Sequence, residues 1–241
     1  NLMPYRHMLA GHPNFLADMR AVAGMMSALF PNHPHAVEWK EQFERTMALN
    51  MKYHVRPDVP QWEADGGRHT ENLACYTHAN LYAMMKPAKL LRKAWQESPV
   101  LYPNYAKWLD WLLHALSAPV DGIRHYPSQG AHAGGHVDDY GAPLHIRMSG
   151  EALTEYEPLL AEYLMHVSPA DARTFEEKEK GTDIWRALPS AIPDSQTGTR
   201  PPLRSRKFTG YGFVMRSGVG TPTEMSVHLQ QIDEGPNYRW G

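Results

Sequence analysis

Apolar residues recur at helical spacing along most of the first 190 residues of this 241-residue chain. Over 14–30 they follow the 3.6-residue period of a helix with one buried face, which runs through Phe15, Met19, Val22, Met26 and Leu29. Proline and glycine divide the rest of this region into predicted helices at 35–51, 71–87, 89–95, 105–116, 151–167 and 168–188. We expect the Met and aromatic positions of these helices to form the core.

The pattern changes at 191–203, where Pro, Ser, Thr and Gly show no period and predict a linker. Beyond it, 207–219 and 224–233 alternate at every second residue, which predicts a β-hairpin with a Gly-rich turn. A lone hairpin is too small to be stable. We therefore expect a mainly α chain. Residues 1–190 would form an incomplete (α/α) toroid of antiparallel helices as the catalytic domain, and 204–241 the first strands of an antiparallel β-sandwich.

Composition narrows the choice of partners. The net charge is −2 and Lys and Arg are scattered, so nucleic acid is not an expected partner. No run of about 18 apolar residues occurs, so no membrane span is predicted. Cys75 is the single cysteine and lies in a helical pattern, which indicates a core residue. The chain begins without Met and stops soon after a strand-like run. We interpret it as a fragment of a longer, exported protein with a periplasmic or extracellular location.

Two segments carry more polar groups than packing needs. In Asp65–Met85 a Gly-rich turn leads into the start of a predicted helix that bears Glu71, Asn72, Tyr76, His78 and Asn80. Asp121–Gly141 has neither helical nor strand period and is longer than a simple connection requires. Its candidate functional side chains are Arg124, His125, Tyr126, His132, His136, Asp138, Asp139 and Tyr140.

Several chemistries are open to these residues. His132 and His136 have a metal-ligand spacing only if they lie on a helix, and the sequence AHAGGH disfavours one, so no metal is predicted here. Two acids across a cleft would permit glycoside hydrolysis in a helical toroid, with Asp65 or Glu71 facing Asp138 or Asp139. A glycan-binding protein without catalysis is the third interpretation.

Elimination on a uronic acid fits the residue types best. The proton at C5 of a uronate is weakly acidic, and neutralising the neighbouring carboxylate with an amide, a protonated acid or a histidine stabilises the enolate-like intermediate. A tyrosine or histidine then removes that proton, and another protonates the leaving oxygen. Aromatic residues such as Trp62 and Tyr76 can stack on sugar rings.

The order of motifs resembles the heparinase II/III-like polysaccharide lyases. The resemblance consists of helices, the block ADGGRHTENLACYTHANL, a Tyr-bearing loop further on, and YGFVMRSG opening a sheet. In that family a glycine turn precedes a pair of residues that neutralises the uronate, and the matching positions here are Glu71 and Asn72. The histidine often found in that pair is absent from this sequence.

The resemblance implies a polysaccharide lyase that cleaves a uronic-acid-containing glycan by β-elimination. Its catalytic groups would be Tyr126, Asn72, Glu71 and His132. Its substrate-binding groups would be Arg68, His69, Tyr76, Arg124, His136 and Trp62. The partner is then an acidic polysaccharide or oligosaccharide. No cofactor is expected, and a structural divalent metal would belong to the part of the β-domain beyond this chain.

Overall fold

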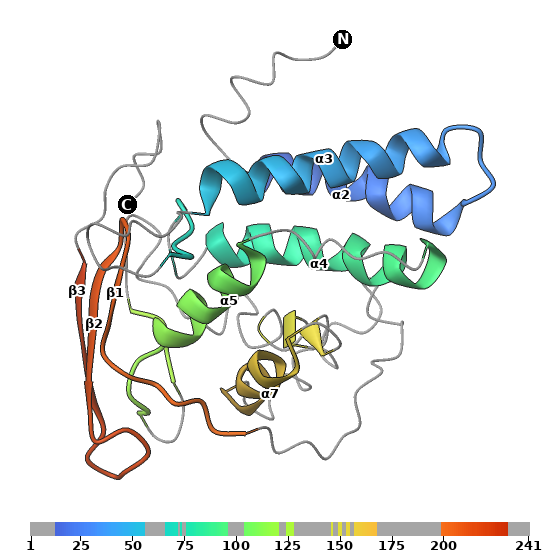
Figure 1. The fold of residues 1–241 in the computed structure, drawn as a ribbon. Coiled ribbons are helices and arrows are strands. Elements are labelled where there is room, and N and C mark those ends of the chain that lie inside the picture. The colour runs from blue at the N-terminus through green and yellow to red at the C-terminus, as the bar shows by residue number, and fades with distance from the viewer. Residues whose placement is uncertain are drawn as a thin grey trace.

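The computed structural model describes residues 13–55, 66–71, 73, 76–95, 104–120, 124–127, 146, 149–150, 153–154, 157–167 and 199–230. Its helices are α2 (Pro13–Leu29), α3 (Ala36–His54), α4 (Tyr76–Trp95), α5 (Tyr105–His114) and α7 (Pro158–Val167). Its strands are β1 (Arg206–Phe208), β2 (Gly212–Ser217) and β3 (Met225–Gln230). α2 and α3 form an antiparallel hairpin above α4, and the sheet stands at one end of the helices beside α5 (Figure 1).

The prediction of an incomplete (α/α) toroid is wrong. In a toroid, successive helix hairpins follow one another around a ring, whereas here α2 packs against both α3 and α4. Gly24 makes this close packing feasible, because a Cβ at that position would lie 2.8 Å from both the Phe43 ring and the Pro87 side chain. Within the described residues, α2, α3 and α4 form one packed group, and α5 and α7 pack against each other beside it.

Helix α4 continues through a proline at which the sequence pattern predicted a break. Separate helices were expected at 71–87 and 89–95, but α4 runs without a break from Tyr76 through Pro87 to Trp95. Proline removes one backbone hydrogen bond from a helix interior. Here the packing of Pro87 against α2 at Gly24 offsets that loss. Because α4 begins at Tyr76, Glu71 lies before the helix and not in its first turn.

The exposed face of α2 is the face predicted for the core. Phe15, Met19 and Val22 are 55%, 60% and 56% exposed, whereas Leu16 is 1% exposed. The inner face instead uses small residues, Ala17, Ala21, Gly24 and Ser27. These residues recur at helical spacing as well, and they let α2 approach α3 and α4 more closely than large side chains would.

The predicted hairpin is confirmed, but the described strands form a single three-stranded antiparallel sheet in the order β1-β2-β3, with no sandwich among them. Phe213 pairs with Leu229 and Met215 with Val227, and these four side chains are exposed on the outer face. Val214 lies on the opposite, buried face. The domain division at 191–203 stays a prediction, and the helix expected at 168–188 lies outside the described residues.

The orientation of α2 can be tested by alanine substitutions on its two faces. Leu16→Ala should lower the free energy of unfolding by about 2–5 kcal/mol, because it leaves a cavity in the core. Met19→Ala is the matched control and should change it by no more than about 0.5 kcal/mol, because Met19 faces solvent. Urea unfolding of the two variants provides the measurement. A larger loss for Met19→Ala would show that the opposite face is buried.

Candidate functional site

The glycine turn of the first polar segment lies directly on α5. Gly67 has φ +103°, and a Cβ there would meet the Lys107 carbonyl oxygen at 2.0 Å. Only glycine permits both this conformation and this approach. The segment is also tied to the end of α3, because the Thr70 amide donates to the His54 carbonyl at 2.9 Å and Val55 bridges to His69. These contacts fix residues 66–71 between α3 and α5.

His69 is the best-held side chain of this segment. Its ring stacks on Trp108 of α5 with 4.7 Å between ring centroids and 16° between the ring planes. Its Nε2 lies 2.7 Å from Asn80 Nδ2, and its Nδ1 accepts a hydrogen bond from the Glu71 amide at 3.2 Å. Burial lowers the pKa of His69 well below its ordinary value, and the charges of His54 and Arg68 lower it further. The imidazole is therefore neutral at neutral pH.

The Glu71 carboxyl is buried next to this imidazole. Its Oε1 accepts from the Asn14 amide of α2 at 3.3 Å, and its Oε2 lies 3.9 Å from His69 Nδ1. Burial raises the pKa of Glu71 well above its ordinary value, although the hydrogen bond from Asn14 opposes the shift. The protonated carboxyl, which can donate a hydrogen bond, is thereby favoured.

Asn80 joins this group to the neighbouring helix. Its side-chain amide and that of Asn50 on α3 exchange two hydrogen bonds, at 3.1 and 3.2 Å. Thr77, which like Asn80 is on α4, donates to the Glu71 carbonyl at 3.0 Å. The start of α4 thus holds both His69 and the backbone of Glu71.

Tyr126 reaches the same helix from the second polar segment. Its ring lies 4.8 Å from the ring of His78, which is between Thr77 and Asn80 on α4. Burial lowers the pKa of His78 to about 3 and raises the pKa of Tyr126. Tyr126 is 5% exposed with its hydroxyl oxygen buried, and His69, Glu71 and His78 have no accessible surface. The two polar segments, distant in sequence, therefore both contact the start of α4, the first at Thr77 and Asn80 and the second at His78.

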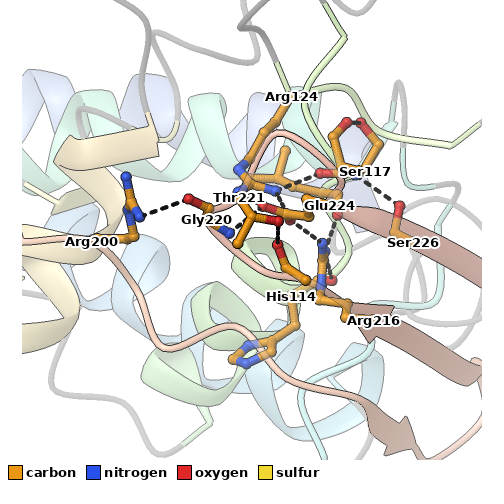
Figure 2. Close-up of polar contacts among 12 residues, drawn as sticks. His114, Ser117, Arg124, Arg200, Arg216, Gly220, Thr221, Glu224 and Ser226 are labelled. Atoms are coloured by element: carbon orange, nitrogen blue, oxygen red, sulfur yellow. Dashed lines mark hydrogen bonds and ion pairs between the residues drawn. The ribbon is translucent and has the colours of Figure 1, made fainter.

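Three further residues predicted to bind sugar, Arg124, Tyr76 and Arg68, are described by the structure. The Arg124 guanidinium binds both carboxylate oxygens of Glu224, at 2.7 and 2.9 Å, and donates to the Ser117 carbonyl at 2.8 Å (Figure 2). Protein groups therefore already occupy much of its donor capacity. Tyr76 is the first residue of α4 and is partly buried, whereas Arg68 is buried beside His69.

The other predicted site residues, Asn72, His132, His136 and Trp62, lie outside the described residues, and so do Asp65, Asp138 and Asp139 of the two-acid alternative. Their roles stay predictions. In the described ranges, no three His, Cys, Asp or Glu side chains are grouped so as to hold a metal ion.

One polar pair on the sheet was missed by the sequence analysis. The Tyr211 hydroxyl lies 3.3 Å from His228 Nδ1 and accepts from Gln230 at 3.4 Å. Burial lowers the pKa of His228 to about 4, and the charge of Arg216 adds to this shift. The available signal was the alternation of β3, where Ser226, His228 and Gln230 share the face opposite to the exposed apolar residues.

No protein-family model, curated protein or solved structure matches this chain. Its interpretation therefore depends on its own residues and geometry. Among the described helices, none is long and apolar enough to cross a membrane.

The protonation of Glu71 can be tested with Glu71→Gln. A carboxyl whose pKa is raised in the folded state stabilises the fold below its unfolded pKa of about 4.3, and this contribution is lost as pH rises through the folded value. Glutamine does not titrate. As pH rises from about 5 to 8, the free energy of unfolding of the variant should therefore increase relative to that of the unsubstituted protein. Urea unfolding at several pH values measures the difference, and a constant difference would mean that Glu71 titrates normally.

Proposed function

We propose that this chain is a polysaccharide lyase that cleaves a uronic-acid-containing glycan by β-elimination. The observation that carries the proposal is the set of polar groups at the start of α4, called here the α4 cluster. It consists of the Glu71 carboxyl, the His69 imidazole and the Asn80 amide near one another, and of the Tyr126 phenol against the His78 imidazole. These are the group types that elimination at C5 requires. The resemblance of the motif order to the heparinase II/III-like lyases supports the same reaction.

Neutralisation of the substrate carboxylate is assigned to Glu71 with the predicted Asn72. Burial raises the pKa of Glu71, so its carboxyl carries a proton under conditions in which an exposed glutamate is ionised. A protonated acid donates a hydrogen bond to the uronate and becomes a stronger partner as negative charge develops in the intermediate. Glu71 is fully buried in the structure, so binding of the sugar has to expose its carboxyl.

Tyr126 is assigned the role of proton donor. Burial raises its pKa, so the phenol keeps its proton at neutral pH. In the reaction a base removes the C5 proton, the C4–C5 double bond forms, the C4–O bond breaks, and Tyr126 protonates the departing oxygen. His132 stays the predicted partner for the base step. Such an enzyme would act on glycans outside the cytoplasm.

Two-carboxylate hydrolysis is the alternative reaction, and it needs a carboxylate pair across the glycosidic bond. The described neighbour of Glu71 is the His69 imidazole, whereas Asp65, Asp138 and Asp139, the acids that hydrolysis would use, lie outside the described residues.

The product decides between these reactions. Elimination creates a C4–C5 double bond conjugated with the carboxylate, which absorbs ultraviolet light, whereas hydrolysis leaves a saturated product. We expect incubation with a panel of uronate polysaccharides to raise the ultraviolet absorbance for at least one of them. Cleavage without this rise would identify a hydrolase. Binding of oligomers without any cleavage would identify a glycan-binding protein.

Tyr126→Phe tests the assigned donor, because it keeps the ring against His78 and removes the hydroxyl. We expect kcat to fall by about 10²–10⁴-fold, with little change in substrate affinity, since other groups hold the sugar. Tyr163→Phe on α7 is the matched control and should leave turnover unchanged. Near-normal turnover by Tyr126→Phe would make the α4 cluster a hydrogen-bonded core and remove Tyr126 from the mechanism.

A further inference from the structure

The segment that carries Tyr126 is attached to the sheet by an ion pair. Glu224 lies at the end of the β2–β3 connection, and its side chain is 2% exposed. Both of its oxygens accept from Arg124, which lies two residues before Tyr126 in the sequence. A bidentate pair of this kind fixes the orientation of both partners as well as their distance.

Further contacts make the attachment stiff at both ends. On the sheet side, Glu224 Oε2 accepts from the Gly220 amide at 2.8 Å, and Glu224 Oε1 lies 3.5 Å from the buried Arg216 guanidinium. On the other side, Arg124 donates to the Ser117 carbonyl, and the Ser117 and His125 backbones are joined by a 2.7 Å hydrogen bond. Figure 2 shows Glu224 between the two guanidinium groups.

Burial alone would raise the pKa of Glu224, but the hydrogen bonds from Arg124 and Gly220 and the charges of Arg124 and Arg216 lower it. Glu224 is therefore an anion at neutral pH, and its removal would leave two neighbouring cations facing each other. This attachment joins residues that are about a hundred positions apart in the sequence. Within the part of the chain that the structure describes, Arg124 and Glu224 form no hydrogen bond or ion pair with His69 or Glu71.

We propose that the Arg124–Glu224 pair is a clamp through which the sheet positions Tyr126 against His78, so that Glu224 and Arg124 are positioning residues for the reaction. Arg124 thereby acts through Tyr126 and not by binding sugar. The catalytic part of this inference rests on the proposed lyase function. The positioning of the Tyr126 ring can be measured without any substrate.

Glu224→Gln keeps the shape of the side chain and removes its charge, and Arg124→Lys keeps the charge and removes the two-pronged geometry. Arg200→Ala is the control, because exposed Arg200 donates to the Gly220 carbonyl of the same β2–β3 connection without touching the clamp. Circular dichroism establishes that each full-length variant is folded. If both clamp variants lost the fold, the pair would be a general folding requirement and the proposal would be overturned.

The first readout is the environment of Tyr126. In protein labelled with 3-fluorotyrosine, its fluorine resonance is assigned by its disappearance in Tyr126→Phe. We expect this resonance to move towards the position of exposed tyrosine in both clamp variants and to stay in place in Arg200→Ala. Amide hydrogen exchange over 117–127 should accelerate about tenfold or more in the clamp variants, while α3 is unchanged. An unmoved resonance overturns the proposal regardless of activity.

The second readout is kinetic. A displacement of about 1 Å in a reacting group can cost about 10²-fold in rate, so Glu224→Gln should lower kcat by about 10- to 100-fold with little change in KM. In a Tyr126→Phe background, Glu224→Gln should have almost no further effect, because the group that it positions is gone. Equal losses in both backgrounds would overturn the positioning role. A chain that forms no unsaturated product at all would refute the lyase function, and the fluorine resonance would still decide whether the clamp exists.

Discussion

A buried arginine, Arg216, joins the sheet to the C-terminal end of α5, and Arg206 of β1 adds an ion pair with Asp110 of the same helix. Arg216 on β2 donates to the carbonyls of His114 and Leu116, which lie at and just beyond the end of that helix, where carbonyls lack helical partners and the helix dipole is negative. Burial lowers the pKa of Arg216 to about 10, an effect that Arg124 increases and Glu224 opposes, so the side chain stays charged at neutral pH. A buried charge needs such partners. Without these two carbonyls, the charge of Arg216 would be left buried between the sheet and α5, next to the Glu224 side chain that binds Arg124.

Periodicity alone located several helices correctly, but it did not identify their inner faces. α2, α3 and α5 lie where the apolar spacing predicts them. On α2, however, large and small residues both recur at helical spacing, and the small face is buried because Phe43 and Pro87 fill the space next to Gly24. Strand β3 also has two alternating faces, with Val227 exposed and His228 half-buried. The choice between two periodic faces depends on partners that are distant in the sequence.

The same limit applies to the candidate site. The sequence singled out two polar segments, and the structure brings Glu71 and Tyr126 from them to the same helix. A local pattern could not reveal that Arg124 is bound by Glu224, about a hundred residues later. Nor could it reveal that His78, which resembles any polar residue in a helix start, lies against the Tyr126 ring. The sequence therefore indicated which residues could carry the chemistry, but it did not indicate which side chains contact one another.

The glycine turn against α5 also limits how this sequence can change. At Gly67 a β-carbon would lie 2.0 Å from the Lys107 carbonyl oxygen, and no rotation of a side chain can relieve that overlap because both atoms are fixed by the backbone. Arg68 and Thr70 can be exchanged for other side chains if their contacts are replaced, but position 67 admits only the residue without a β-carbon. In any set of diverged sequences that share this fold, glycine at 67 should persist after the neighbouring positions have varied, and its loss should coincide with a displaced α5.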